Sequence, residues 1–154
     1  MRGPGRLLQS TPFRTFVLYP AIVVAWELLL NEGRLRFQPW FLPLLVWGYL
    51  QYRLVGRYRI QLGGGGPGMD TPPERLVVSG PFAWCRNPMY LGHIIFLLGL
   101  TLGLQSALAA IITVATMGWF QWRVMRDEKR LRARFGQPYV DYSGRVKRWI
   151  PFLF

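Results

Sequence analysis

The sequence predicts an all-α integral membrane protein with about four transmembrane helices. Three observations indicate this class. The 154 residues are 51% hydrophobic and 16% aromatic, with seven tryptophans, a content that is typical of membrane proteins. Long apolar runs recur along the chain, and the basic residues gather in alternate connecting segments. Because a chain of this length normally folds as one unit, we expect a single domain over residues 1–154.

The apolar runs define four expected spans. The first is apolar except for Glu27, and the second is apolar except for Arg53 near its end. The last two come from one long run, since no charged residue occurs between Arg86 and Arg123. As one helix this run would be roughly 54 Å long, whereas a hydrocarbon core is about 30 Å thick. We therefore expect a hairpin that turns near Leu102–Ala107, with spans at about 13–30, 39–55, 88–103 and 106–123.

The distribution of positive charge predicts the orientation of these spans. The chain has 19 Lys and Arg against 7 Asp and Glu. With the N-terminus in the cytoplasm, 17 of the 19 basic residues lie on the cytoplasmic side, and Arg34 and Arg36 remain outside. Both termini are then cytoplasmic, as are a loop over 56–86 and a tail over 123–154. Because topology accounts for the charge, we expect anionic lipid as the partner and no nucleic acid.

Metal chemistry is not expected. The chain has one cysteine, Cys85, and one histidine, His93. This is too few ligands of the usual kinds for a zinc or iron–sulfur site built by the protein alone, and it excludes an intrachain disulfide.

The start of the hairpin carries an unusual set of polar residues. Asn87 is a good helix N-cap, Pro88 suits the first helical position, and Tyr90 fits an interfacial aromatic belt. On that interpretation the residues only begin a membrane helix. Alternatively, the helix start offers unsatisfied N–H groups and a positive dipole end to an anionic or polar ligand. The two interpretations stay open on this segment alone.

The segments outside the spans have distinct patterns. Gln61–Glu74 is rich in glycine and predicts a flexible linker, because no Gly-Lys-Ser/Thr follows it. The residues 75–84 predict a short interfacial strand or an irregular approach to the membrane. The tail segment "DEKRLRARFG" predicts a helix that continues from the membrane and stops at Gly136. A tight hairpin would bring Arg123, Asp127 and Glu128 close to the start of the hairpin.

Two motifs in this order resemble a known family. "RNPMYLG" followed by "DEKRLRARFGQPYVDYSGRVKRWIP" is similar to the isoprenylcysteine carboxyl methyltransferases and their phospholipid-methyltransferase-like bacterial relatives. The resemblance covers Gly80–Pro151, about half of the chain. Two positions depart from the pattern, since Asn87 replaces a histidine and the acidic pair begins with Asp127. An amide does not titrate near neutral pH, which puts general-base use of this position in doubt.

The resemblance implies an integral membrane enzyme that uses S-adenosylmethionine. It would transfer a methyl group to a lipid-linked or small hydrophobic acceptor, with a carboxylate favoured, at the cytosolic membrane face. Arg123 and Glu128 would be the catalytic residues, with Arg123 orienting the nucleophile of the acceptor. The residues carried over to the cofactor site are Asn87, Pro88, Met89, Tyr90, Glu128, Tyr139 and Tyr142.

Other functions stay open at this point. Membrane sterol reductases have a similar C-terminal hairpin and tail, so a nicotinamide-dependent reductase is an alternative, as is a non-catalytic membrane protein of the same fold. The sequence also leaves amine, thiol and phenol acceptors open. Four short helices leave pairing with a second copy of the chain open as well.

Overall fold

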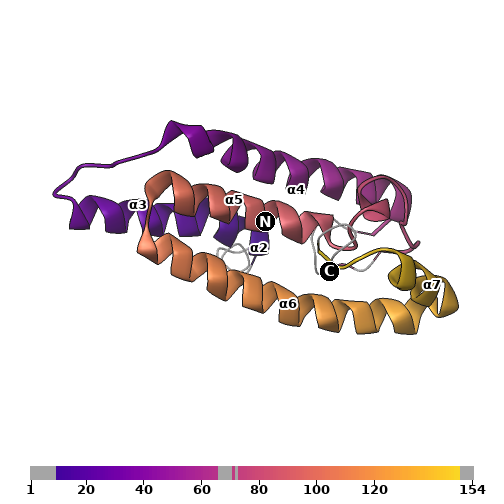
Figure 1. Ribbon diagram of the computed structural model, residues 1–154. Helices are drawn as coiled ribbons and strands as arrows, with labels where there is room; N and C mark the ends of the chain where they lie inside the picture. Colours follow the sequence, from indigo (N-terminus) through magenta and orange to yellow (C-terminus); the bar gives the residue numbers. More distant parts are fainter. Residues whose placement is uncertain (1–9, 66–70, 72, 150–154) are drawn as a thin grey trace, which may run out of the picture. The chain divides into compact units, whose positions relative to one another are not determined.

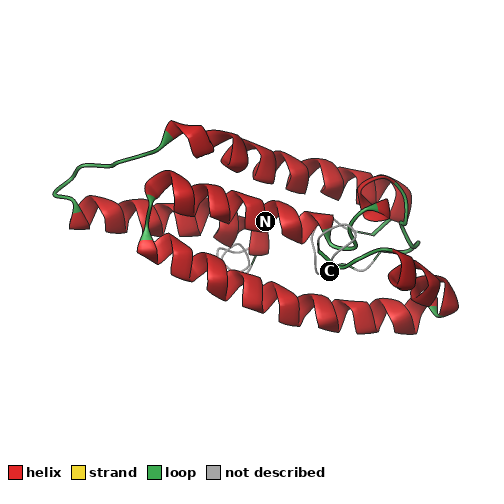
Figure 2. Cartoon of the chain, viewed as in Figure 1, coloured by secondary structure: helices red, strands yellow, loops and turns green. Residues whose placement is uncertain are grey.

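The computed structural model describes residues 10–65, 71 and 73–149. All regular secondary structure in these residues is helical, which confirms the predicted all-α class (Figure 2). The strand considered for residues 75–84 is wrong, because this segment contains the 3-10 helix η3, Gly80–Ala83. The described residues form two compact units. The first comprises 10–50 and 92–117, and the second comprises 51–65, 71, 73–91 and 118–149.

The first helical stretch contains a widened turn. It consists of α2 (Thr11–Phe13), the π-helical η1 (Arg14–Leu18) and α3 (Tyr19–Leu30), without a break between them (Figure 1). Pro20 lies near the start of α3 and has no N–H to donate to the preceding turn. A π-helical turn directly before the proline provides room for its ring, so the helix continues.

Helix α4 (Leu42–Gly63) is longer than the predicted span. It follows the 3-10 helix η2 (Pro39–Phe41) and continues to Gly63, so residues 56–63, which we expected in the loop, are helical. The helix ends where a run of four glycines begins, since glycine is a poor helix former. The Gly63 carbonyl oxygen accepts hydrogen bonds from the N–H groups of Glu74 and Arg75, at 2.7 and 2.9 Å. Residues 74 and 75 therefore lie against the end of α4.

The predicted hairpin is present. Helix α5 (Pro88–Leu104) and helix α6 (Ala107–Phe135) are joined by a two-residue turn in which Gln105 has φ 50° and Ser106 accepts a hydrogen bond from Ala109 N–H (3.2 Å) (Figure 1). As predicted, α6 continues past the expected span and stops before Gly136, which has φ 59°. A short helix, α7 (Gln137–Arg145), follows.

The first unit is packed through small residues. Its buried core consists of Val23, Leu97, Leu100, Leu104 and Ala109. Alongside it, α4 and α5 approach closely at Gly48, where an added Cβ atom would lie 2.5 Å from the backbone nitrogen of Phe96. Small residues allow such close backbone contact, which is how membrane helices commonly associate.

The outer surface of the first unit is strongly apolar. Leu29 is 80% exposed, Trp40 is 87% exposed and Val114 is 69% exposed. In the described part of the chain, two helices are long and apolar enough to cross a bilayer, Thr11–Leu30 and Ala107–Phe135. Helix α5 is apolar but shorter. These features agree with an integral membrane protein, because such side chains would be poorly placed in water.

Candidate functional site

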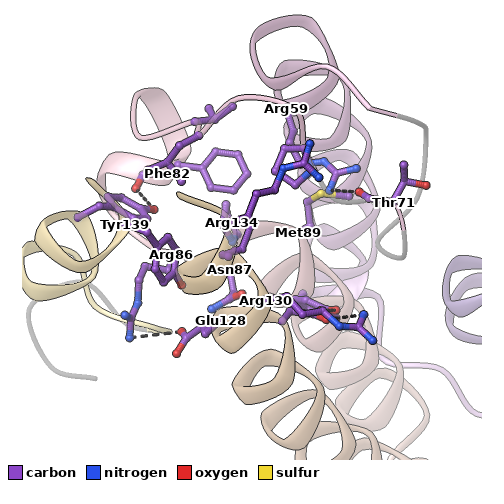
Figure 3. A pocket seen from close by; sticks show the side chains of 18 of the residues that line it. Arg59, Thr71, Phe82, Arg86, Asn87, Met89, Glu128, Arg130, Arg134 and Tyr139 are labelled. Carbon is purple, nitrogen blue, oxygen red and sulfur yellow. Dashed lines mark hydrogen bonds and ion pairs between the residues drawn. The ribbon is translucent and has the colours of Figure 1, made fainter. Parts of the chain in front are cut away.

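A cavity of about 530 Å³ lies in the second unit (Figure 3). Its wall is built from the end of α4, the segment 71–82, the start of α5, the second half of α6, and α7. The lining combines aromatic and aliphatic side chains with four arginines and two carboxylates, namely Arg59, Arg86, Arg130, Arg134, Asp127 and Glu128. Such a mixed lining suits a ligand that carries an apolar ring and charges of both signs.

The start of α5 is tied to the C-terminal segment. The Arg86 N–H donates to the Lys147 carbonyl at 2.9 Å, and the Asn87 side-chain amide donates to the Arg148 carbonyl at 3.2 Å. The Cys85 thiol also donates to the Arg148 carbonyl, at 3.4 Å. Burial raises the pKa of Cys85 to about 11, so its thiol stays protonated at neutral pH. Residues at the first motif thus bind the second motif through the backbone carbonyls of Lys147 and Arg148.

Glu128 holds two arginines at the cavity wall. Arg148 bonds it in a fork, with Nε to Oε1 at 3.1 Å and Nη2 to Oε2 at 2.8 Å. Arg86 Nη2 lies 3.4 Å from Oε1, and the ion pair is visible in Figure 3. The hydrogen bonds that Arg148 donates to Glu128 raise the pKa of Arg148. The three side chains are mostly buried, so this cluster fixes the segment around Arg148 against α6.

A second polar cluster connects Tyr90 with α6. Arg123 Nε donates to the Tyr90 hydroxyl at 2.8 Å, and that hydroxyl donates to Asp127 Oδ2 at 2.9 Å. Arg123 Nε also lies 3.8 Å from the same carboxylate oxygen. The Arg123 side chain is 6% exposed and lies over the Trp119 ring, 5.2 Å from its centroid. The cluster therefore orients Tyr90 and Asp127, which both line the cavity.

The two tail tyrosines form a neutral part of the wall. The Tyr142 hydroxyl donates to the Phe82 carbonyl at 2.7 Å, which holds η3 against α7. Burial and the charge of Glu128 raise the pKa of Tyr139 to about 12. Burial also raises the pKa of Tyr142. Both side chains are therefore protonated at neutral pH and offer hydroxyl groups and ring faces.

All seven residues expected at the cofactor site line this one cavity: Asn87, Pro88, Met89, Tyr90, Glu128, Tyr139 and Tyr142. Arg123 is not among the lining residues, and it contacts the cavity wall through Tyr90 and Asp127. His93 belongs to the first unit, where it stacks on Phe16. Whether the seven residues bind a cofactor stays a prediction.

Sequence reasoning missed one side of the cavity. Arg59 on α4 donates to the Thr71 carbonyl at 3.2 Å, and both residues line the cavity together with Phe82 (Figure 3). The sequence predicts a cytosolic loop over 56–86 around Arg59 and a flexible linker over Gln61–Glu74 around Thr71, and neither indicates a cavity wall. The sequence feature that could have indicated this wall is a charged residue, Arg59, four residues before the glycine run that begins at Gly63.

The lining fits S-adenosylmethionine by its chemistry. The cofactor has an adenine ring, a sulfonium, an ammonium and a carboxylate. The aromatic side chains offer faces to the ring, and Arg130 and Arg134 suit the carboxylate. Glu128 already pairs with Arg86 and Arg148, and Asp127 Oδ2 is engaged by Tyr90 and Arg123. Asp127 Oδ1, which lies 3.9 Å from the exposed Arg130, is therefore the carboxylate oxygen best placed for a cationic group.

Relatives of the chain include methyltransferases and a metal-resistance protein. Protein-S-isoprenylcysteine O-methyltransferase of Mus musculus is 35% identical over 83 residues, which is 51% of this chain and 28% of that protein. The enzyme of the same name from Saccharomyces cerevisiae is 33% identical over 79 residues, covering 51% of this chain and 33% of that protein. The nickel-cobalt-cadmium resistance protein NccN of Alcaligenes xylosoxydans xylosoxydans is 30% identical over 78 residues, covering 51% of this chain and 37% of that protein.

This chain therefore spans about a third of the length of these relatives. The family model for phospholipid methyltransferase matches residues 49–137, more than half of the chain. Isoprenylcysteine and phospholipid methyltransferases use S-adenosylmethionine as methyl donor, which agrees with the expected enzyme class and cofactor. The chain belongs to the phospholipid methyltransferase family.

Proposed function

We propose that the protein transfers a methyl group from S-adenosylmethionine to a lipid-linked or small hydrophobic acceptor, with a carboxylate favoured, at the cytosolic face of a membrane. The single observation that carries this proposal is that both sequence motifs line one cavity of about 530 Å³. The relatives named Protein-S-isoprenylcysteine O-methyltransferase support a prenylated carboxylate as acceptor. A nicotinamide-dependent reductase is not favoured, because the matching family is one of methyltransferases.

The cavity residues have distinct roles in this proposal. The start of α5, residues 87–90, and the ring faces of Tyr139 and Tyr142 enclose the donor and exclude water. Asp127 attracts its cationic groups, and Glu128 contacts the methionine end of the donor while holding Arg86 and Arg148 at the wall. When bound, S-adenosylmethionine supplies a methyl group that is already activated by the positive sulfur. The protein then mainly has to hold donor and acceptor in line, so a general base at Asn87 is not required.

Arg123 is our candidate for orienting the acceptor. Its guanidinium contacts two lining residues, Tyr90 and Asp127. We expect Arg123→Ala to abolish methyl transfer and to weaken cofactor binding much less than Tyr90→Ala does, because Arg123 itself does not line the cavity. Arg123→Lys should restore little activity, because lysine lacks the planar fork that binds a carboxylate. Full activity of Arg123→Lys would exclude this role.

The proposed membrane arrangement has four spans and cytoplasmic termini. It is supported by the charge asymmetry, by the two long apolar helices and by the apolar α5. Cysteines introduced by Gln61→Cys and Leu35→Cys, both at exposed positions, test it in intact cells. The native Cys85 is buried and serves as an unreactive background. An impermeant thiol reagent should label position 35 and not position 61, and the opposite pattern would contradict the orientation.

A transfer assay tests the reaction. Purified protein would be incubated with S-adenosylmethionine labelled in the methyl group and with one of three acceptors: an S-prenylated cysteine with a free carboxylate, its methyl ester, and an aminophospholipid. We expect label in the free acid only. Label in the aminophospholipid would show that the acceptor is an amine and would contradict the carboxylate. Absence of label in all three, in protein that binds the donor, would contradict the proposed acceptor class.

A further inference from the structure

One side of the large cavity is uncharged. In the described residues, the segment before the hairpin lines it with Thr71, Pro73, Leu76, Val77 and Phe82. The two carboxylates and three of the four arginines of the lining come instead from residues 86–134, just before α5 and on α6. The fourth arginine, Arg59, lies on α4 and donates to the Thr71 carbonyl. Figure 3 shows Phe82 well apart from Glu128 and Arg130, so the ring of a ligand and its charged end have different places in the cavity.

Phe82 offers an open ring face at this uncharged side. Its side chain is half-buried, and its ring points into the cavity (Figure 3). The other lining aromatics are already packed. The rings of Tyr139 and Tyr142 lie on each other with centroids 6.1 Å apart, and the Tyr90 ring packs against Phe120 at 4.8 Å. Within the described part of the chain, no ring or cation lies against Phe82 in this way.

Contacts from two helices hold Phe82 in place. The 3-10 helix η3 is a single four-residue turn and would not be stable alone. On one side, the Tyr142 hydroxyl of α7 donates to the Phe82 carbonyl at 2.7 Å. On the other side, the Tyr58 hydroxyl of α4 lies 2.9 Å from Ser79 Oγ, and the Tyr58 ring leaves no room for a Cβ atom at Gly80, which has φ 58°. A ring whose backbone is fixed before binding loses little entropy when a ligand stacks on it.

We propose that Phe82 is the stacking platform for the adenine ring of the methyl donor, and that Tyr142 is a positioning residue that acts through Phe82. This inference rests on the proposed function, because it takes S-adenosylmethionine as the ligand of the cavity. The methionine end of the donor then lies toward Asp127 and Arg134 of α6. Base stacking on an aromatic side chain is strong enough that loss of the ring weakens binding about tenfold.

Two ligands separate the two ends of the donor. S-adenosylhomocysteine carries adenosine together with an ammonium and a carboxylate, whereas 5′-methylthioadenosine carries adenosine without these two charges. Loss of a contact to the adenine ring should therefore weaken both ligands by the same factor. Loss of a contact to the carboxylate should weaken S-adenosylhomocysteine alone. Arg134→Gln is a change of the second kind, because Arg134 lines the charged side of the cavity.

The test is calorimetric titration of the purified full chain in detergent, with 5′-methylthioadenosine measured by competition with S-adenosylhomocysteine. We expect Phe82→Ala and Phe82→Leu to weaken both ligands about tenfold. Phe82→Leu keeps most of the apolar volume, so it decides the question if circular dichroism shows that Phe82→Ala is unfolded. Phe135→Leu removes the same ring at the end of α6, outside the cavity lining, and should change the affinity for 5′-methylthioadenosine less than twofold.

A double-mutant cycle tests the positioning role of Tyr142. Tyr142→Phe removes the hydroxyl that holds the Phe82 carbonyl, and it should weaken 5′-methylthioadenosine about threefold. In the Phe82→Leu background it should have no further effect, because no ring is left to be placed. Equal weakening in both backgrounds would show that Tyr142 acts independently of Phe82 and would overturn the positioning role.

The remaining outcomes decide the adenine platform. Unchanged affinity for both ligands in Phe82→Ala, or affinity equal to that of the unmodified protein in Phe82→Leu, would overturn it. Weakening of S-adenosylhomocysteine alone would place Phe82 at the methionine end and would also overturn it. If the unmodified protein binds neither ligand, the proposed function fails and this inference fails with it. If the unmodified protein binds both ligands and the Phe82 variants bind equally well, only this inference fails.

Discussion

The Glu128–Arg148 pair should stabilise the fold measurably. Its two charge-assisted hydrogen bonds, at 2.8 and 3.1 Å, join α6 to the C-terminal segment. Hydrogen bonds to charged groups contribute about 1.5–3 kcal/mol each, but the Arg148 side chain is 29% exposed, which weakens the pair. We therefore expect a coupling free energy of about 2 kcal/mol between Glu128→Ala and Arg148→Ala in a double-mutant cycle.

The assay is reversible unfolding in mixed micelles, followed by circular dichroism, for the two single variants and the double variant. A matched control cycle uses Asp127 and Arg130, which lie one turn apart at 3.9 Å with the arginine 65% exposed. That pair should couple by less than about 0.5 kcal/mol. Free energies that add within about 0.5 kcal/mol for Glu128 and Arg148 would refute the claim that this contact holds the tail in place.

Three further changes test the packing and the protonation states. Gly48→Ala should lower the midpoint of thermal unfolding, because its Cβ would lie 2.5 Å from a backbone nitrogen of α5. Gly118→Ala, whose Cβ would have no atom within 4 Å, should raise the free energy of unfolding by up to about 1 kcal/mol. Equal unfolding midpoints for the two variants would contradict the close contact at Gly48. Cys85 should react slowly with a maleimide at pH 7, and rapid labelling of the folded protein at that pH would contradict its burial. The neutral thiol contributes stability that is fully present below about pH 9, and this stability should be lost as the pH rises through about 11. Tyr142→Phe should cost about 1 kcal/mol through loss of the hydrogen bond to Phe82, and an unchanged unfolding free energy would argue against that contact.

Much of the helical architecture could be predicted from the sequence, because its signals are local. The absence of charge between Arg86 and Arg123 predicted the hairpin, and Gly136 marked the end of α6. The end of α4 was harder to predict. Arg53 indicates that the apolar span ends near residue 55, but a charge that ends a span does not end a helix. Arginine is a good helix former, and α4 stops only where the glycines begin at Gly63.

The candidate site was predictable where the hairpin itself brings distant parts of the sequence together. The start of α5 and the tail were paired correctly because a hairpin returns its second helix beside its first. The contacts of Arg123 were not predictable, since they depend on which face of α6 meets Tyr90. The same holds for Asn87, whose amide donates to the Arg148 carbonyl: no sequence pattern indicates a side-chain bond to a backbone group 61 residues away.

Binding of the methyl donor tests the central claim most directly. Purified protein in detergent would be titrated calorimetrically with S-adenosylhomocysteine and, separately, with NADPH. The proposal predicts saturable binding of one S-adenosylhomocysteine per chain, no binding of NADPH, and at least tenfold weaker binding in Tyr90→Ala, which removes a ring from the cavity wall. Binding of NADPH without binding of either adenosyl compound, S-adenosylhomocysteine or S-adenosylmethionine, would contradict it.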